Sequence, residues 1–286
     1  MILVTGATGN LGSAVISHLL KNTATGNIVA FARDENKAKG LKEKGIEVRI
    51  GTYDDLSSLD LAMNGIERLL LISSNGQNRL QHHKNVLAAA KKAAIKHIVY
   101  TGIAMKNIET AAIRLYMEDL TKTEDYIKES GLTYTVLRNT LYTGGNPLYE
   151  GEKVFETGIR LPAGNGKAPF ALRREMGEAA ANTLLQNGHE NQTYTITAGE
   201  LYSYEDVAHA LSDLSGRNVK YTDADPTTFP AKLKELGLPE IVVRIVTGFA
   251  TDIKNHQFEM ISKDLEKLLG RKPASLKESL KEVFHL

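Results

Sequence analysis

Cysteine is absent from the 286-residue sequence, which excludes disulfides, thiolate metal ligands and a cysteine nucleophile. No apolar run approaches the ~20 residues that span a bilayer, and no secretory signal pattern precedes the first apolar segment. The 35 lysines and arginines nearly balance the 34 aspartates and glutamates, so no net field attracts nucleic acid or an anionic membrane. The 8 histidines lack the spacing of metal ligands on one helix face. We therefore expect a cytoplasmic protein with no metal, no nucleic-acid partner and no membrane partner.

The first 140 residues alternate short apolar runs with longer amphipathic stretches. The short runs are almost continuously apolar, which is typical of parallel strands that are covered on both faces. The pattern predicts an α/β fold with a Rossmann-type, doubly wound parallel sheet. The strand candidates are residues 2–6, 27–33, 46–51, 68–74, 96–102 and 132–139, and the helix candidates between them are 11–21, 34–44, 56–63, 78–94 and 115–130.

A glycine-rich turn lies between the first strand and helix candidates, in the stretch MILVTGATGNLG. In such a turn, backbone N–H groups and the positive end of the helix can hold a pyrophosphate. Gly6 would allow the tight turn, Gly9 the close approach of phosphate, and Gly12 the close packing of helix on strand. The spacing differs from G-x-G-x-x-G, so a bend without a ligand is the alternative. The position at the start of a βαβ unit favours dinucleotide binding.

The second strand candidate ends in Arg33, which is followed by Asp34. An arginine at this position suits the 2′-phosphate of NADP, whereas an acidic residue suits the ribose 2′-hydroxyl of NAD. Arg33 takes the terminal strand position, so NADP(H) is favoured and NAD(H) is the second choice. The alternative is that Arg33 is only a solvated residue at the start of a helix.

After Asn139, glycine, proline and asparagine interrupt each apolar run. The rest of the chain predicts a smaller, mostly helical C-terminal lobe. We expect residues 1–140 to form the NAD(P)-binding core and residues 141–286 a substrate-side lobe, with some strands returning to the core sheet. The helix candidates here are 174–187, 203–214, 227–236, 238–255, 261–269 and 275–283, and the strand candidates are 192–198 and 218–222.

The motifs TGATGNLG, VAFAR, LLLISS, IVYTG and TYTVLRN occur in this order and together resemble the atypical short-chain dehydrogenases/reductases. Among these the chain is most similar to the NmrA-like proteins, in the branch of bacterial NADPH-dependent quinone and triphenylmethane reductases. The family often has an acidic residue where Thr52 stands. The resemblance implies that the cofactor is bound by Gly6, Thr8, Gly9, Asn10, Leu11, Gly12, Arg33, Thr52, Tyr53, Asp54, Ile72, Ser73, Ser74, Tyr100 and Thr101.

The catalytic Y-x-x-x-K motif of typical short-chain dehydrogenases is not found. That spacing places the lysine beside the tyrosine and lowers the pKa of the phenol. In RLYMEDLTKTEDYIKES, Lys122 follows Tyr116 by six residues, and Lys128 follows Tyr126 by two. The departure weakens reactions that deprotonate a hydroxyl, such as sugar-nucleotide epimerisation. Hydride transfer to an electrophile does not need this pair, because holding the nicotinamide against the acceptor supplies most of the catalysis.

The resemblance places the substrate pocket around LRNTLY and the loops that follow. Tyr142 is the candidate pocket wall or weak acid, beside Asn139, with Thr101 and Lys122 as further catalytic candidates. Pro162, Phe170, Arg173 and Phe249 would complete the pocket, although an aromatic residue in such a loop more often belongs to a local core. Arg138, at a strand end, is expected to hold the C-terminal lobe in place.

These features predict an NAD(P)H-dependent oxidoreductase that reduces quinone-like or other small planar electrophiles. Its partner would be a small-molecule electron acceptor, and assembly as a homodimer is left open. The first alternative is a non-catalytic NAD(P)-binding redox sensor that docks a protein, which the missing tyrosine–lysine pair would suit. The second is an enzyme like the nucleoside-diphosphate-sugar epimerases.

Overall fold

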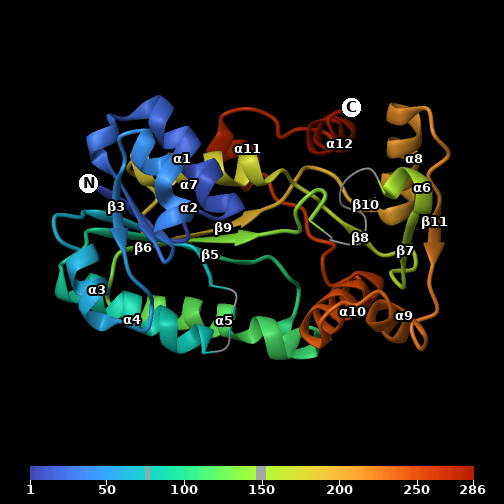
Figure 1. The fold of residues 1–286 in the computed structure, drawn as a ribbon, viewed down its shortest axis with the longest axis horizontal. Helices are drawn as coiled ribbons and strands as arrows, with labels where there is room; N and C mark the ends of the chain where they lie inside the picture. Colours follow the sequence, from blue (N-terminus) through green and yellow to red (C-terminus); the bar gives the residue numbers. More distant parts are fainter. Residues whose placement is uncertain (75, 77, 146–152) are drawn as a thin grey trace.

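A parallel sheet of seven strands forms the centre of the computed structural model, which describes residues 1–74, 76, 78–145 and 153–286 (Figure 1). The strand order is β3-β2-β1-β4-β5-β6-β9, and each neighbouring pair is parallel. This confirms the predicted doubly wound fold. The strands are β1 (Ile2–Val4), β2 (Ile28–Ala32), β3 (Glu47–Ile50), β4 (Arg68–Leu71), β5 (His97–Ile103), β6 (Tyr134–Asn139) and β9 (Gln192–Ile196).

Both faces of the sheet are buried, which explains the continuous apolar runs of the central strands. Successive side chains of a strand point to opposite faces. In β1, Ile2 and Val4 accordingly join one buried cluster, whereas Leu3 joins the other. β2 repeats the alternation, with Ile28 on the first face and Val29 on the second.

Helices cover the two faces in separate layers (Figure 1). One face carries α1 (Asn10–Asn22), α2 (Glu35–Glu43), α7 (Arg173–Leu185) and α11 (Asp264–Leu269). The other carries α3 (Leu56–Ala62), α4 (Arg79–Lys92) and α5 (Arg114–Glu129). Two short 3-10 helices, η1 (Thr25–Asn27) and η2 (Ile108–Thr110), lie in connecting loops.

A smaller lobe stands at the carboxyl ends of the central strands and has a buried apolar cluster of its own (Figure 1). Its strands are short because glycine and proline divide the sequence there. Three of them, β7, β8 and β10, were not predicted. The elements of the lobe are α6 (Val154–Thr157), β7 (Ile159–Leu161), β8 (Lys167–Ala168), β10 (Tyr202–Ser203), α8 (Tyr204–Ser215), β11 (Tyr221–Asp223), α9 (Phe229–Glu235), α10 (Glu240–Lys254) and α12 (Leu276–Phe284).

Two later elements return to the core. β9 pairs with β6 at the edge of the main sheet, and α11 packs against α7 and β9. α11 begins at Asp264, later than predicted, and the residue two before it, Ser262, is tied to β9 through its N–H, which donates to the Thr197 hydroxyl. Among the described residues, no helix has the length and hydrophobicity needed to cross a membrane.

The central strand β1 lies between β2 and β4, so the winding of the chain reverses direction there. In doubly wound sheets this reversal opens a crevice at the carboxyl ends of the strands. The segments that follow β1, β4, β5 and β6 all emerge at this edge. The sequence candidates for cofactor and substrate binding are therefore brought to one side of the molecule.

Candidate functional site

The glycine turn after β1 has the geometry of a phosphate cradle. Gly6 has a φ of +59°, in the left-handed region that favours glycine, and its carbonyl accepts the Gly9 N–H at 2.9 Å. A Cβ on Gly12 would lie 2.3 Å from the Gly6 carbonyl oxygen and 2.9 Å from the Cα of Ala7. Gly12 is therefore required for the close packing of α1 on the turn.

The amino-terminal end of α1 is open to a ligand. Its first intrahelical bond runs from the Ser13 N–H to the Gly9 carbonyl at 2.8 Å, so the N–H groups of Asn10, Leu11 and Gly12 have no helical acceptor. No side chain caps the helix, and no acidic residue occupies its first turn. Gly9 and Asn10 are exposed and Thr8 is half-buried. These donors and the helix dipole together suit a pyrophosphate.

The structure separates the roles of Arg33 and Asp34. The Asp34 carboxylate caps α2 by accepting the N–H groups of Asn36 and Lys37 at 2.9 and 3.2 Å. Arg33 is exposed, and its guanidinium has no hydrogen bond or ion pair to any described residue. The Asp34 carboxylate is therefore engaged as a helix cap, whereas the Arg33 guanidinium has no partner among the described residues. A guanidinium in this state suits a 2′-phosphate.

The segment after β3 packs beside the end of β4. Tyr53 stacks on Phe31 with ring centroids 6.1 Å apart, and burial raises the pKa of its phenol to about 12. The exposed Asp54 carboxylate lies 2.7 Å from Nε2 of His82, which comes from α4. The Thr52 hydroxyl accepts the Asp55 N–H and so shapes the turn into α3. Thr52, Tyr53 and Asp54 thus lie together after β3, which is the strand next to β2, and Arg33 follows β2.

Thr5 joins the glycine turn to the end of β4. Its hydroxyl donates to the Leu70 carbonyl and accepts the Ile72 N–H, both at 3.0 Å. A Cβ on Gly6 would lie 3.4 Å from the Cβ of Ile72, so the two segments pass side by side. Sequence reasoning missed Thr5, although its place directly before Gly6 was the available signal.

The end of β5 presents a hydroxyl to the segment after β4. The Thr101 hydroxyl accepts the Ser73 N–H at 3.2 Å and is buried, so in this arrangement it fixes the Ser73 backbone. Tyr100 points to the opposite face, where its hydroxyl donates to the Leu120 carbonyl in the core. The Tyr100 side chain therefore points away from the segment after β4, and its backbone is the part that lies on the side of that segment.

A buried hydrogen-bonded chain fixes Ser74, and sequence reasoning missed its central residue, His83. The Ser74 N–H donates to Nε2 of His83 at 3.2 Å, and Nδ1 lies 2.8 Å from the Thr123 hydroxyl. That hydroxyl donates to the Asp119 carbonyl at 2.7 Å. Nε2 must therefore be the acceptor and Nδ1 the donor, so the ring is neutral. Burial and the nearby Arg79 lower the pKa of His83 to about 3.

Tyr142 and Arg173 face each other beyond the end of β6. The guanidinium lies over the ring, 4.7 Å from its centroid, and burial raises the pKa of the phenol. The segment is held because the Ala171 N–H donates to the Leu141 carbonyl and the Thr143 N–H to the Ala171 carbonyl. Asn139 is buried, and its Oδ1 has no hydrogen-bond donor among the described residues. A side-chain hydrogen bond joins Asn139 to Tyr142, so these two candidates lie side by side.

The remaining catalytic and pocket candidates, which are Lys122, Phe170, Pro162 and Phe249, are buried or engaged with other residues, so they are less available to a substrate. Lys122 is exposed and bound to Glu118 at 2.8 Å, an interaction that raises the pKa of its ammonium and makes it a poorer acid. Phe170 is 5% exposed and packs on Tyr204, in the buried cluster of the lobe. Pro162 is also buried, and the half-buried Phe249 packs on Phe258.

Arg138 does not hold the lobe, contrary to expectation. Its guanidinium binds Glu124 on α5 through bonds of 2.9 and 2.5 Å, and Lys128 shares the same carboxylate. Glu124 is buried, and the two cations offset the cost of burying its charge. Arg138 therefore joins β6 to α5 within the core. In the described part of the chain, no group of His, Asp or Glu is arranged to hold a metal ion.

Comparisons with known proteins show the family to which the chain belongs. A family model described as the NmrA-like family matches residues 1–283. Quinone oxidoreductase 2 of Escherichia coli is 36% identical over 289 residues, covering 100% of this chain and 99% of the relative. The crystal structure of an E. coli NADPH-dependent quinone oxidoreductase complexed with NADPH has a TM-score of 0.91 at 34% identity, covering 99% of each chain.

A second solved structure shows the same similarity. Triphenylmethane reductase of Citrobacter sp., complexed with NADP(H), has a TM-score of 0.91 at 35% identity and covers 99% of this chain and 100% of that chain. The match to the family model and the full-length relative agree with the motifs that first indicated the resemblance. The chain belongs to the NmrA-like family.

Proposed function

We propose that this protein is an NADPH-dependent reductase that passes hydride to quinone-like or other small planar electrophiles. The observation that carries the proposal is the arrangement of one sheet edge. This edge holds the open phosphate turn after β1, the unpaired Arg33 guanidinium and the Tyr142 ring that we assign to the pocket wall. The Asp34 carboxylate is engaged as the cap of α2. The full-length relatives named for NADPH and for quinone reduction support the same reading.

The cofactor side of the site fits NADP(H) residue by residue. The N–H groups of Asn10, Leu11 and Gly12 would hold the pyrophosphate, and Arg33 the 2′-phosphate. The exposed Lys37, which forms no ion pair with a described residue, lies in the first turn of α2 and adds positive charge near Arg33. When bound, the nicotinamide supplies a hydride to the acceptor.

The backbone from Ile72 to Ser74 would line the nicotinamide end of the site. Three separate side chains, Thr5, Thr101 and His83, each bind one N–H of this segment. These bonds fix its path before any ligand arrives. A preorganised wall lowers the entropy cost of holding acceptor and cofactor face to face, and that proximity is the main catalytic contribution we assign to the chain.

Proton supply has a small part in this proposal. Tyr142 has a phenol whose pKa is raised by burial, so it is protonated at neutral pH and can donate a hydrogen bond to an acceptor oxygen. Asn139 adjoins it with an amide oxygen that no described donor satisfies. We assign Tyr142 the role of pocket wall and hydrogen-bond donor, with Asn139 beside it. Thr101 and Lys122 have other partners.

The division of labour follows from the same placement. We assign cofactor binding to residues 1–140 and acceptor binding chiefly to residues 141–286, with Arg173 in the acceptor wall and Pro162, Phe170 and Phe249 as its supporting core. A cytoplasmic location, where NADPH is at hand, completes the proposal. A homodimer is compatible with it and is tested by the mass of the protein in solution.

The experiment is to follow NADPH oxidation with a panel of quinones, using NADH as the second donor. A rate above the enzyme-free blank that is larger with NADPH supports the proposal, and no rate with any acceptor refutes it. The competing function is a redox sensor that binds NADP(H) without turnover and docks a protein, because α5 lacks a tyrosine and lysine four residues apart. Tight NADPH binding without turnover, together with a co-purifying partner, would select the sensor.

A further inference from the structure

Arg173 has no anionic partner among the described residues, whereas the nearby Arg174 and Arg271 are paired with carboxylates. Its half-buried guanidinium rests on the Tyr142 ring and forms no hydrogen bond or ion pair with any described residue. A Cβ on Gly145 would lie 3.5 Å from its Nη2, so the backbone of that turn borders the same group. A guanidinium held in this way keeps its N–H donors available for a ligand.

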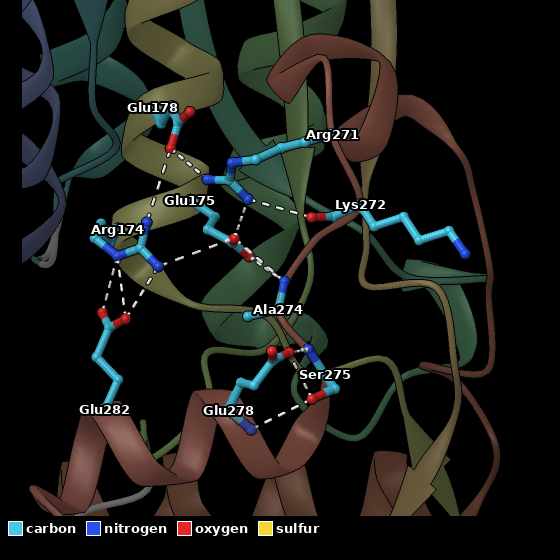
Figure 2. Close-up of polar contacts among 9 residues, drawn as sticks. All are labelled: Arg174, Glu175, Glu178, Arg271, Lys272, Ala274, Ser275, Glu278 and Glu282. Atoms are coloured by element: carbon cyan, nitrogen blue, oxygen red, sulfur yellow. Dashed lines mark hydrogen bonds and ion pairs between the residues drawn. The ribbon is translucent and has the colours of Figure 1, made fainter.

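Among the described residues, the nearby carboxylates of Glu175, Glu178 and Glu282 bind other arginines (Figure 2). Arg174, the next residue, binds Glu282 at 3.0 Å and lies 3.8 Å from Glu178. Arg271 binds Glu175 at 2.6 Å and Glu178 at 2.7 Å. The two consecutive arginines therefore differ. The Arg174 guanidinium is paired at the surface, whereas the Arg173 guanidinium lies over the Tyr142 ring and binds no carboxylate of a described residue.

Helix packing brings Arg173 close to the cofactor turn. A Cβ on Gly177 would lie 2.6 Å from the Cβ of Ala14, and His18 of α1 bonds to Asn182 of α7 at 3.0 Å. Both pairings run in the same direction with nearly the same offset, so α1 and α7 are parallel. Four residues before Gly177 and Ala14 stand Arg173 and Asn10. The two helices thus begin at the same level, with Arg173 across from the open end of α1.

We propose that Arg173 is an anion-binding residue that completes the cofactor site from the substrate-side segment, its ligand being a phosphoryl or similar anionic group. This inference rests on the proposed function, because it takes the pyrophosphate of NADPH as the anion nearest to the start of α1. The same chemistry could come from an anionic substituent on the acceptor. In either case Arg173 links cofactor and acceptor binding, because its guanidinium also packs on the Tyr142 ring, which we assign to the acceptor pocket.

The test compares Arg173→Met with Arg174→Met, which removes the same charge one residue away from a guanidinium that is already paired. The dissociation constant of NADPH is measured by its fluorescence without any acceptor. The KM is then measured for naphthoquinone and for naphthoquinone sulfonate. Arg173→Lys keeps the charge and replaces the planar fork, and thermal unfolding of each variant checks that it is folded.

We expect Arg173→Met to raise the NADPH dissociation constant about tenfold or more, with Arg173→Lys between it and the wild type, and Arg174→Met to change it less than about twofold. An unchanged NADPH constant with a selective rise in KM for the sulfonate would assign the anion to the acceptor instead. Equal effects of the two methionine variants, or no effect on either ligand, would overturn the inference. Absence of quinone turnover would refute the proposed function but leave the NADPH binding result intact.

Discussion

Nδ1 of His83 lies 2.8 Å from the hydroxyl oxygen of Thr123, and this contact fixes the neutral tautomer that accepts the Ser74 N–H on the other nitrogen. The folded pKa, about 3, lies well below the ordinary value of 6.5. In the unfolded chain the ring gains a proton as the pH falls through about 6.5, while the folded ring stays neutral. The stabilisation is therefore complete above pH 6.5 and is lost progressively toward pH 3.

The prediction is a loss of unfolding free energy of up to about 1.4 kcal/mol for each pH unit below about 6. Denaturant unfolding at several pH values measures it. His83→Gln should lower stability at neutral pH, because the bonds to Ser74 and Thr123 are disturbed, and should flatten the acid dependence. The pKa values of the buried His97 and His189 are also lowered by burial, so a residual slope is expected. An unaltered slope in His83→Gln would contradict the assignment.

Gly12→Ala tests the packing of α1 on the glycine turn. The new Cβ would meet the Gly6 carbonyl oxygen at 2.3 Å, so the helix must shift. We expect a loss of about 1–3 kcal/mol in unfolding free energy and weaker NADPH binding. Gly40→Ala is the matched control, because Gly40 lies in α2 with nothing within 4 Å of a Cβ there. That control should gain about 0.5–1 kcal/mol and bind NADPH normally.

Arg33→Ala should weaken NADPH binding about tenfold or more and leave NADH binding nearly unchanged, because only NADPH carries the 2′-phosphate. Calorimetric titration with each nucleotide measures the ratio. Asp34→Ala supplies the contrast, since it removes the cap of α2 at a cost of about 1 kcal/mol in stability. Equal losses for both nucleotides in Arg33→Ala would show that Arg33 does not recognise the phosphate.

Tyr142→Phe separates a pocket wall from a general acid. The variant keeps the ring under Arg173 and removes only the hydroxyl. We expect kcat for a quinone to fall less than about tenfold, whereas loss of a general acid costs on the order of 10²–10⁴-fold. Steady-state kinetics with saturating NADPH decides between them. A fall of a thousandfold would make the Tyr142 phenol the catalytic acid.

Glu175 and Glu282 provide a matched comparison of a buried and an exposed carboxylate in one network (Figure 2). The Glu175 side chain is 1% exposed and accepts the Arg271 guanidinium and the Ala274 N–H. Glu282 is 45% exposed and binds Arg174. We expect Glu175→Ala to cost on the order of 3 kcal/mol and Glu282→Ala less than about 1 kcal/mol in unfolding free energy. Similar losses in the two variants would contradict this account.

The features that could be predicted from sequence depend on local patterns. The glycine turn follows directly from its position between a strand and a helix, and the apolar runs give the sheet. The sequence favours Arg33 over Asp34 by its position at the strand end, and the structure adds that the Asp34 carboxylate is engaged, because it accepts the N–H groups of Asn36 and Lys37. Either of two adjacent residues can bind a ligand or cap a helix, and the position of the helix N–H groups determines which one becomes the cap.

Other parts of the site depend on contacts between distant segments. His83 bonds to Thr123, 40 residues away, and Thr5 bonds to Ile72, 67 residues away, so the sequence gives no local signal of these pairings. Phe170 reads as a loop aromatic in the sequence but joins the lobe cluster with Tyr204. Arg173 was predicted as a pocket residue, and only the structure shows that no carboxylate of a described residue binds it, because Arg174 and Arg271 bind Glu175, Glu178 and Glu282.

The measurement that tests the central claim most directly is the transfer of deuterium from NADPH labelled at C4 of the nicotinamide to a triphenylmethane dye. Hydrogen added to the central carbon of this acceptor does not exchange with water. Preparations labelled on each face of the ring are used separately, and the reduced dye is analysed by mass spectrometry. Our account predicts deuterium in the product from one of the two preparations, in an amount equal to the NADPH oxidised. Reduced dye without deuterium from both preparations would contradict direct hydride transfer, and folded protein that binds NADPH but reduces neither dye nor quinone would contradict the assignment as a reductase.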